Sequence, residues 1–531
     1  MSATAIVAKP EAVWVPRTNP WLIAFVVSLA AFMEVLDTSI ANVALPHIAG
    51  NLGASSDEST WVLTSYLVSN AIVLPITGWL VSLIGRKRFF IICITLFTVS
   101  SLLCGMAPTL GFLLLARVIQ GVGGGGLQPM AQAILADTFP PSKRGLAFSV
   151  YGMTAIVAPA IGPTLGGWVT DSYSWRWIFL MNLPVGIMAI LLVLRFVEDP
   201  PFLKRTTVHE SRIDYFGFGL LAVGVGFLQI VLDKGQEDDW FGSHFITTLS
   251  IIAAISLVTL VIWELRVKHP ILDLRLFKNV NFATASVMML MVGGASFSTT
   301  VLVPLYLQSL MGYTAEKAGM VLSLAAVLLL IELPIVGQLT ARVQARYLIA
   351  FGWAALTLAM FYSTRRLDLE MSFSSASWLR IAQYLPMGFI FIPATMVAYI
   401  GLPQEKSNAI AGLINFVRNI GASAGTSAVT TILARRAQVH QVMLASHTGM
   451  GDRMFQNSSG GLAGSLQHSM GAGAQRHAYG TLYRSMLSQA STLSYIDTFW
   501  LLGVVAGIMF FASFLLRSNH PRKADPEAMA H

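Results

Sequence analysis

The chain has 531 residues, of which 55% are hydrophobic and only 11% are charged. A soluble domain carries about 25% charged residues, so this composition, with a mean hydropathy of +0.66, excludes an ordinary soluble protein and indicates a surface that faces lipid. The formal net charge of +8 would suggest a nucleic-acid partner in a soluble protein, but here the basic residues fall in short segments between apolar runs, as in membrane proteins.

The apolar runs have the length of transmembrane helices. Polar residues precede the first run and no small-residue cleavage site follows it, so we expect this run to stay in the mature protein. A helix needs about 20 apolar residues to cross a bilayer. Fourteen runs meet this need, at 21–44, 60–84, 89–107, 110–136, 146–170, 176–196, 213–232, 245–264, 281–310, 317–341, 346–364, 378–402, 407–434 and 497–517. We therefore expect an all-α polytopic membrane protein with fourteen transmembrane helices.

The lysines and arginines between these runs are distributed unevenly. If the N-terminus is cytoplasmic, twenty-one of them fall in inner segments and only six, Arg380 among them, in short outer loops. Cytoplasmic loops carry the excess of Lys and Arg. Because an even number of spans puts both termini on one side, we expect both to be cytoplasmic.

Two acidic residues interrupt the first apolar run. Glu34 and Asp37 lie three residues apart, on one face of a helix. An ionisable group inside a membrane costs roughly 2.5–3.5 kcal/mol on insertion, so it indicates a functional site. Burial and a neighbouring carboxylate both favour the protonated form of an acid, and we expect the pair, Asp37 above all, to take up and release a proton. The alternatives are a structural ion pair for Asp37 and recognition of a cationic substrate by Glu34; Pro46 is expected to end the helix.

Small residues and prolines gather in the fourth and fifth runs. Gly162 and Gly166 are spaced four residues apart, and small residues at this spacing let helices approach closely in lipid. Pro159 and Pro163 each remove a backbone hydrogen bond from the same run. Kinked and tightly packed helices suit an interface that moves, and tight packing without motion is the alternative.

One long outer segment, 435–496, interrupts the pattern of short loops. It is rich in Gly, Ser, Gln and Met, and near its end Leu482, Met486, Ala490 and Leu493 recur at helical spacing. This spacing fits a short amphipathic helix on the outer leaflet. The composition fits a solvated, poorly ordered loop equally well.

Two short patterns recur along the chain. The stretch "GWLVSLIGRKR" at 78–88 is echoed by "GQLTARVQAR" at 337–346, and "RVIQG" at 117–121 is echoed by "RNIGASAG" at 418–425. Such repeats indicate two duplicated halves, which leaves the seventh and eighth runs as extra helices. The expected parts are a cytoplasmic tail 1–20, a six-helix bundle 21–196, a linker 197–264 with two extra transmembrane helices, a six-helix bundle 265–517 that includes the outer segment, and a cytoplasmic tail 518–531.

Several motifs resemble those of the major facilitator superfamily. The stretch 78–88 resembles its loop motif, Gly-x-Leu-x-Asp-x-x-Gly-Arg-Lys, "LLARVIQGVGGG" its fourth-helix arginine motif, and "APAIGPTLGG" the fifth-helix motif of its proton-driven antiporters. "LDTSIANVALP" and "WRWIFLMNLPVG" are similar to signatures of the fourteen-helix drug/proton antiporters of the EmrB/QacA type. The residues that these motifs connect with conformational change and gating are Gly78, Gly85, Arg86, Lys87, Pro159, Gly162, Pro163, Gly166 and Gly167.

The resemblance implies a major facilitator fold of two six-helix bundles plus two linking helices. It also implies that the first and fourth helices are neighbours. Arg117 needs an anion or carbonyl groups to face it. We therefore expect Arg117 to pair with Asp37 or Glu34 in one conformation and to release that acid in another. A static pair is the alternative. In this chain Ser82 stands where the loop motif has its acid. The family is thought to use that acid to latch the transporter on its inner side, and this chain lacks the acid for that contact.

The expected substrate cavity draws on polar residues of both halves. Glu332 stands alone in the tenth run, where some members of the family link an acid to cationic drugs; an acid near the inner rim is the alternative. Arg418 repeats the position of Arg117 and has either a gating or a structural role. The residues that we expect in the cavity are Glu332, Asn42, Gln120, Asn415 and Arg418.

The resemblance implies a secondary multidrug exporter of a bacterial inner membrane. Protons would enter down their gradient while hydrophobic toxic compounds leave, with no cofactor, no metal and no enzymatic activity. It further implies an EmrA-like periplasmic adaptor and a TolC-like outer-membrane channel as partners in a tripartite pump, with 435–496 as a docking surface. The alternatives are an exporter or importer dedicated to one metabolite or fatty acid and, in a different class, a passive channel or a membrane enzyme.

Overall fold

Helices form the regular structure of residues 16–201, 214–267, 270–446, 453–470 and 473–517, which the computed structural model describes. The first helices are α1 (Pro20–Leu52), α2 (Ser56–Ile84), α3 (Arg86–Gly105), α4 (Leu110–Gly124), α5 (Leu127–Thr138), α6 (Arg144–Ser172), α7 (Trp177–Leu180) and α8 (Asn182–Phe196). The next are α9 (Tyr215–Lys234), α10 (His244–Arg266), α11 (Val280–Ser309), α12 (Ala315–Leu339) and α13 (Ala345–Arg366). The last are α14 (Phe373–Tyr384), α15 (Pro386–Val397), α16 (Ser407–Ala445), α17 (Arg453–Met470) and α18 (Ala474–Ala512).

Each of the fourteen apolar runs corresponds to one helix or to two consecutive helices, with ends that differ by a few residues. Within the described residues, eleven spans are long and apolar enough to cross a membrane, and α6, which bends by 46°, makes a twelfth. The other two runs correspond to α14 with α15, which are separated at Leu385, and to α16, whose polar residues Asn415 and Arg418 are buried. The prediction of an all-α polytopic membrane protein is confirmed.

The ends of the helices carry residues that suit them. Ser55 and Glu58 form a capping box at the start of α2, in which each side chain bonds the backbone N–H of the other residue. Helix α1 ends at Gly53, whose φ of 64° lies in the left-handed region. The prediction that Pro46 ends α1 is wrong: the helix continues to Leu52, because one lost hydrogen bond near an exposed helix end is tolerated.

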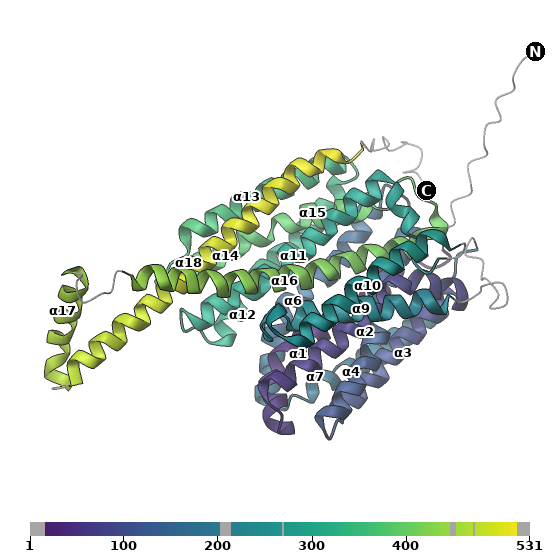
Figure 1. Ribbon diagram of the computed structural model, residues 1–531. Coiled ribbons are helices and arrows are strands. Elements are labelled where there is room, and N and C mark those ends of the chain that lie inside the picture. The colour runs from purple at the N-terminus through teal and green to yellow at the C-terminus, as the bar shows by residue number, and fades with distance from the viewer. Residues whose placement is uncertain (1–15, 202–213, 268–269, 447–452, 471–472, 518–531) are drawn as a thin grey trace, which may run out of the picture.

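The helices form two groups that meet along the middle of the molecule (Figure 1). In the first group α1 packs on α6, and α4 packs on α2 and α3; in the second, α11 packs on α16 and α13 on α18. Helix α9 packs on both α2 and α16, with α10 beside it, so this pair borders both groups. The division of the chain at residues 197 and 265 stays a prediction.

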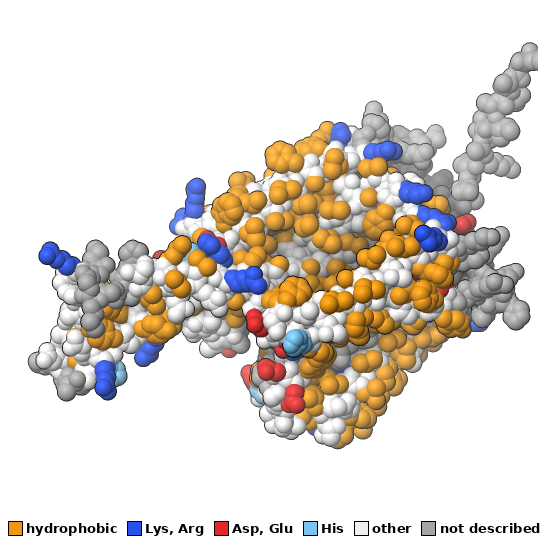
Figure 2. Space-filling view, in the orientation of Figure 1, with side chains coloured by type: hydrophobic (Ala, Val, Ile, Leu, Met, Phe, Trp, Pro, Cys, Tyr) orange, Lys and Arg blue, Asp and Glu red, His pale blue; other side chains and the backbone are white. Residues whose placement is uncertain are grey.

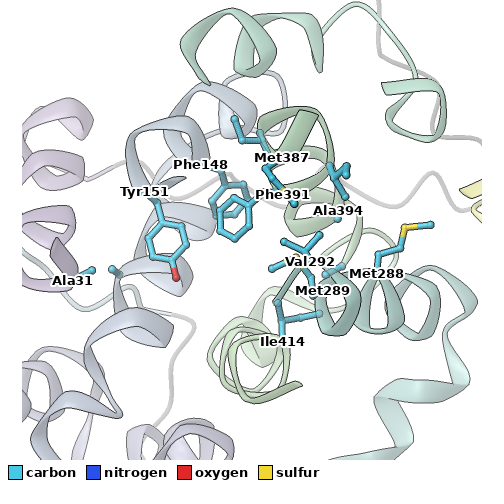
Figure 3. Packing of buried hydrophobic residues seen from close by; sticks show 14 of the residues in the cluster. Ala31, Phe148, Tyr151, Met288, Met289, Val292, Met387, Phe391, Ala394 and Ile414 are labelled. Atoms are coloured by element: carbon cyan, nitrogen blue, oxygen red, sulfur yellow. The ribbon is translucent and has the colours of Figure 1, made fainter. Parts of the chain in front are cut away.

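Aromatic side chains fill the junction between the two groups, where α6 packs on α12 and α15 and where α2 packs on α16. The rings of Tyr151 and Phe391 stack with centroids 6.1 Å apart, and those of Phe148 and Tyr399 with centroids 5.7 Å apart. Figure 3 shows the α6 rings facing Phe391 and Met387 of α15. The junction is therefore a closely packed apolar layer around a few polar groups.

An arm made of α17 and the adjoining ends of α16 and α18 projects beyond the other helices (Figure 1). The helix expected around Leu482 is part of α18, which has 39 residues and runs on into the last apolar run. A helix of that length measures about 58 Å, about twice the thickness of the hydrocarbon core. For the described residues of 435–496, the disordered-loop alternative is wrong, and the helix continues a span instead of lying separately on a leaflet.

The outer surface of the helical body is apolar. Figure 2 shows hydrophobic side chains over most of the visible face of the body and Lys and Arg mainly near its ends and along the arm. Leu191, Ile255 and Phe511 are each more than 60% exposed. Exposed side chains of this kind are suited to lipid and not to water.

Candidate functional site

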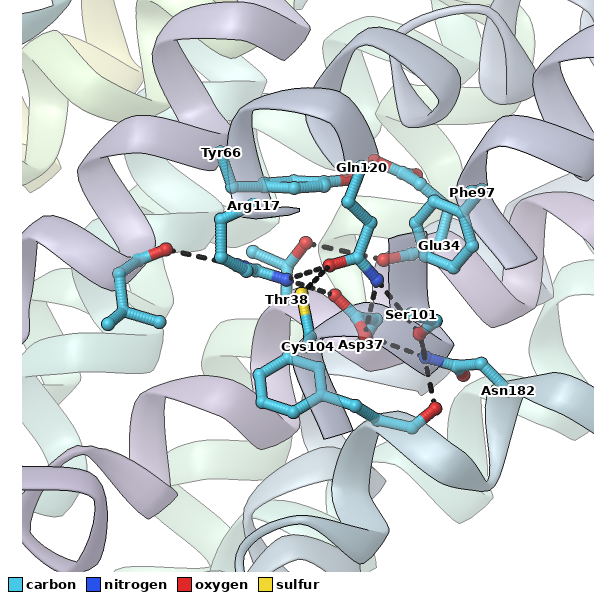
Figure 4. Close-up of polar contacts among 12 residues, drawn as sticks. Glu34, Asp37, Thr38, Tyr66, Phe97, Ser101, Cys104, Arg117, Gln120 and Asn182 are labelled. Atoms are coloured by element: carbon cyan, nitrogen blue, oxygen red, sulfur yellow. Dashed lines mark hydrogen bonds and ion pairs between the residues drawn. The ribbon is translucent and has the colours of Figure 1, made fainter. Parts of the chain in front are cut away.

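The first buried charge cluster surrounds Asp37 of α1 (Figure 4). Arg117 of α4 donates from Nη1 to Asp37 Oδ2 over 2.7 Å, and both side chains are fully buried. Asp37 Oδ1 also accepts from Gln120 Nε2 at 3.1 Å and from Asn182 Nδ2 at 2.7 Å. Because every partner donates, the geometry suits an ionised carboxylate, and it ties α1 to α4 and α8.

Further hydrogen bonds hold the partners of Asp37 in place. Arg117 Nε donates to the carbonyl oxygen of Val62 at 3.0 Å, and its Nη1 donates to Gln120 Oε1 at 2.7 Å. Ser101 Oγ accepts from both Gln120 and Asn182. A buried ion pair is favourable only when its remaining hydrogen-bonding groups are satisfied, and here they largely are.

The second cluster surrounds Glu34, one turn before Asp37. Its Oε1 accepts from Tyr66 Oη at 2.8 Å and from Asn70 Nδ2 at 3.2 Å, and its Oε2 accepts from Gln128 Nε2 at 2.5 Å. Tyr66 also joins the two clusters, because the guanidinium of Arg117 lies 4.4 Å from the centroid of its ring. The prediction that Arg117 pairs with one of the two acids therefore holds for Asp37 and not for Glu34.

The Glu34 cluster extends across the junction to α16. Arg418 Nη2 donates to Gln128 Oε1, so one glutamine joins Arg418 to Glu34. Tyr151 Oη donates to Asn415 Oδ1 at 3.0 Å, and Asn415 Nδ2 donates to Gln132 Oε1 at 2.5 Å. A continuous polar chain thus leads from Asp37 in one helix group to α16 in the other.

A small cavity of about 30 Å³ lies at this junction, well below the several hundred Å³ of pockets that hold drug-sized ligands. Most of its wall is apolar or aromatic, and one arginine, Arg418, contributes to it. The residues that line it are Ala155, Pro159, Val292, Gly293, Ser296, Phe297, Thr300, Tyr384, Met387, Phe391 and Arg418.

The other expected cavity residues lie elsewhere in this conformation. Asn42 is exposed, Gln120 belongs to the Asp37 cluster, and Asn415 lies in the buried chain across the junction. Glu332 is 8% exposed and neither carboxylate oxygen has a partner among the described residues; a Cβ on Gly388 would meet its Oε1 at 2.7 Å. Their substrate roles stay predictions.

The glycines of α6 lie against α1. A Cβ on Gly162 would come within 2.3 Å of Ser39 Oγ, and one on Gly166 within 2.9 Å of Ile40, so the predicted close approach is confirmed as packing. A Cβ on Gly167 would instead point into open space, with the nearest atom 4.0 Å away. Pro163 has no N–H, so it cannot form the helical hydrogen bond to the carbonyl oxygen of Pro159. Ser39 Oγ of α1 donates to that carbonyl instead, at 3.0 Å.

The loop motif lies where the ends of α2, α3, α5 and α16 meet. Gly85 has a φ of 92° and separates α2 from α3, and a Cβ on Gly78 would come within 2.7 Å of Ala409 on α16. Arg86 forms a buried ion pair with Asp137 of α5. Asp137 Oδ1 also accepts from Ser407 Oγ of α16 at 2.7 Å, so an acid joins the two helix groups here.

The remaining residues of the motif act locally. Lys87 binds with its backbone N–H to Asp199 Oδ1 at 2.8 Å and with Nζ to the carbonyl of Leu194 at 2.7 Å. Ser82, at the position of the family's acid, donates to the carbonyl of Trp79 in its own helix. Asp137 thus makes the cross-group contact that Ser82 does not make.

Several members of these clusters were not among the residues expected from the sequence. Asn182, Tyr66 and Gln128 are polar groups inside apolar runs, which is the one signal that could have found them. The prediction that Arg380 lies in a short outer loop is wrong, because Arg380 lies in α14 and is fully buried.

A helical protein with a lipid-facing surface, a buried ion pair and a cavity between two helix groups belongs to the class of membrane transporters. Residues 27–426 match the family model described as Major Facilitator Superfamily. The chain is 36% identical to the multidrug export protein EmrB of Escherichia coli (strain K12) over 490 residues, which cover 91% of this chain and 94% of that protein. The chain therefore belongs to the major facilitator superfamily, in its EmrB-type family.

Two further comparisons agree with this result. The fatty acid resistance protein FarB of Neisseria gonorrhoeae is 36% identical over 419 residues, which cover 79% of this chain and 82% of FarB. The crystal structure of the human organic anion transporter MFSD10 (TETRAN) aligns with 94% of this chain and all of that chain, with a TM-score of 0.56 and 12% identity. At that identity the structural match supports the fold alone.

Proposed function

We propose that this protein is a proton-coupled multidrug exporter of a bacterial inner membrane, with both termini in the cytoplasm. The observation that carries the proposal is the fully buried Asp37–Arg117 pair in α1 and α4. Ionisable groups at membrane depth are retained where they serve transport. The similarity to the multidrug export protein EmrB supports the export of lipophilic toxic compounds.

The proposed coupling step is the protonation of Asp37. The ionised carboxylate holds donors from α4 and α8 around it. A proton on Asp37 removes the charge that attracts Arg117, so the three helices are held less tightly. Helix α1 packs on α6 through Gly162 and Gly166, and α6 packs on α12 of the other group. A shift of α1 would therefore reach the junction that opens and closes the cavity.

The arm is the proposed docking surface for a periplasmic adaptor, which would join the transporter to an outer-membrane channel in a tripartite pump. The segment 435–496 contains five arginines and a single acidic residue, Asp452. A surface with this charge suits an acidic protein partner. Replacement of 446–473 by a short Gly-Ser linker should leave membrane insertion intact and abolish efflux into the medium; unchanged efflux would contradict this role.

Dependence on the proton gradient tests the function itself. Proteoliposomes that contain the purified protein should export the lipophilic dye ethidium when a pH gradient is imposed, and export should stop when an ionophore collapses the gradient. A passive channel would let the dye equilibrate in both conditions. No cofactor or metal is expected to be required.

A second candidate is an exporter dedicated to one acidic metabolite or fatty acid. The observations that favour it are the arginine in the cavity wall and the similarity to the fatty acid resistance protein FarB. A multidrug exporter should move chemically unrelated dyes and drugs in the same proteoliposomes, whereas a dedicated exporter should move only one class.

A further inference from the structure

The helices of the second group repeat the arrangement of the first. Helix α11 packs on α16 as α1 packs on α6, and α12 packs on α14 as α2 packs on α4. The sequence marks the same correspondence, since "LPITGWL" at 74–80 in α2 returns as "LPIVGQL" at 333–339 in α12. The consecutive helices α14 and α15 therefore correspond to α4 and α5.

An arginine occupies the same place in the two corresponding helices. Arg117 is the eighth residue of α4 and Arg380 is the eighth residue of α14. Each is followed by a glutamine three residues later, in "RVIQ" and in "RIAQ", and neither arginine has any solvent exposure. Arg418 lies in α16, which corresponds to α6. The counterpart of Arg117 in the second group is therefore Arg380.

The two glutamines make the same hydrogen bond. Gln120 Nε2 donates to Ser101 Oγ of α3 at 3.0 Å, and Gln383 Nε2 donates to Ser363 Oγ of α13 at 2.9 Å. Helix α13 packs on α18 as α3 packs on α8, so the two serines come from corresponding helices. An aromatic ring also lies against each guanidinium, with its centroid 4.4 Å away in the first group and 4.1 Å away in the second.

The acid of the first site has no counterpart in the second. Helix α11 corresponds to α1, and it contains no acidic residue between Val280 and Ser309. Asp37 Oδ2 accepts from Arg117, whereas the hydroxyl Oγ1 of Thr300 in α11 accepts from Arg380 Nη2 at 2.8 Å. Nε and Nη1 of Arg380 have no hydrogen-bond partner among the described residues. The second site thus has the cation and a neutral hydroxyl in place of the anion.

A proton cannot change the charge of this second site. Arginine stays protonated in proteins, and the hydroxyl of Thr300 is neutral. In the first site a proton on Asp37 removes one of the two charges and leaves Arg117 alone. The second site therefore has at all times the charge that the first site has only while Asp37 is protonated.

We propose that Arg380, Gln383 and Ser363 form a second copy of the coupling site, which lacks the acid and holds a fixed positive charge. The acid–arginine switch then operates in the first group alone, and Arg380 is a positioning residue that holds α14 against α11. This inference rests on the proposed role of Asp37 in proton coupling. It follows that an acid placed at position 300 should complete the second site.

Thermal unfolding of the purified protein in detergent at pH 8 tests the missing charge. Thr300→Asp supplies a carboxylate beside Arg380, and Thr300→Asn is the matched neutral control of the same shape. The Asp variant should unfold about 2 °C or more above the Asn variant, because an anion compensates the buried guanidinium. In an Arg380→Gln background this difference should vanish or reverse, since the new carboxylate then has no cation.

Two results would overturn the second site. One is a Thr300→Asp variant that unfolds at or below the temperature of Thr300→Asn, or that fails to fold where Thr300→Asn folds, because Arg380 then has no need of an anion. The other is an equal advantage of Asp over Asn in the Arg380→Gln background, because the stabilisation would then not come from the guanidinium.

The same comparison at lower pH tests the relation to proton coupling. The advantage of Thr300→Asp over Thr300→Asn should be full at pH 8 and shrink as the pH is lowered towards 4, because a protonated carboxyl supplies no charge. A purely structural contact would not depend on pH in this way. An advantage that stays constant down to pH 4 would contradict the claim that this site copies one that exchanges a proton.

These measurements need no gradient, so they are separable from the test of the proposed function. If Asp37→Asn keeps gradient-driven efflux while Thr300→Asp is stabilised through Arg380, the coupling role of Asp37 fails and the matching second site remains. If Asp37→Asn loses gradient-driven efflux and Thr300→Asp gains no stability over Thr300→Asn, the second site alone is contradicted.

Discussion

Arg117 and Arg380 are both fully buried arginines, one in each helix group, and their surroundings differ. Arg117 has an acid at 2.7 Å and hydrogen bonds to Val62 and Gln120. Arg380 has one hydroxyl and one aromatic ring. Arg117 is thus balanced by an acid of its own helix group, whereas Arg380 has no acid partner among the described residues.

This difference suggests a division of labour between the two helix groups. A closed ion pair can respond to a proton, because protonation of Asp37 removes one of its two charges. An arginine without an acid partner cannot respond in this way, because it stays charged. We therefore propose that the Asp37 cluster couples protons to transport, whereas Arg380, beside the cavity, has no acid partner among the described residues.

Arg117→Ala should have the largest effect. It leaves the carboxylate of Asp37 buried without its cation, which costs about 3–5 kcal/mol of folding stability, and it should abolish gradient-driven ethidium efflux. Thermal unfolding in detergent and efflux from proteoliposomes measure the two effects. The double variant Asp37→Asn with Arg117→Gln removes both charges and should regain most of the stability but none of the efflux. Intact efflux in Arg117→Ala would refute the assignment.

Gly162→Ala should have the next largest effect. The added Cβ would come within 2.3 Å of Ser39 Oγ, and overpacking of this kind costs about 1–3 kcal/mol, so α1 and α6 must separate and efflux should fall strongly. Gly167→Ala is the matched control, since its Cβ meets nothing closer than 4.0 Å, and efflux should be unchanged. Equal activity of the two variants would show that the α1–α6 contact does not matter for transport.

Glu34→Gln should have a moderate effect. The amide keeps one acceptor oxygen but loses the charged carboxylate to which Tyr66, Asn70 and Gln128 donate. A hydrogen bond to a charged group contributes about 1.5–3 kcal/mol to stability. Efflux of ethidium should decrease and remain dependent on the gradient. If Glu34→Gln instead removes all gradient dependence, the proton is carried by Glu34 and the roles of the two acids must be exchanged.

Arg380→Gln should have the smallest effect on folding. Because no acid is left unpaired when this guanidinium is removed, the free energy of unfolding should stay within about 1 kcal/mol of the wild-type value or rise. Arg117→Gln, measured in the same thermal unfolding assay, should be clearly destabilised. A loss of stability in Arg380→Gln as large as that in Arg117→Gln would mean that Arg380 is part of the structural core and that the comparison fails.

The sequence predicts much of this architecture, because length and hydropathy decide which runs can cross a membrane. The Asp37–Arg117 pair also follows from the sequence, because a charge buried in an apolar run is stable only when an opposite charge faces it. The arm does not follow: segment 435–496 has a Gly- and Ser-rich composition that is compatible with a loop, and only the continuity of α16 and α18 with their spans reveals it.

Arg380 illustrates a second limit of the sequence. It lies near the start of the run 378–402, after a stretch of serines that lowers the local hydropathy, and so it resembles a loop residue. The structure begins α14 at Phe373 and buries Arg380 two turns further on. Its burial depends on packing against residues distant in sequence, such as Thr300, which a local pattern does not contain. The same holds for Asn182, whose partners Asp37 and Ser101 are distant in sequence.

The most direct test of the central claim is ethidium transport by Asp37→Asn in two assays on the same proteoliposomes. Asparagine can still accept a hydrogen bond from Arg117 but cannot bind and release a proton. We expect that the variant loses net efflux driven by a pH gradient and keeps exchange of ethidium between the two sides when no gradient is present. Net efflux at the wild-type rate, with wild-type dependence on the gradient, would contradict the claim that Asp37 couples protons to transport.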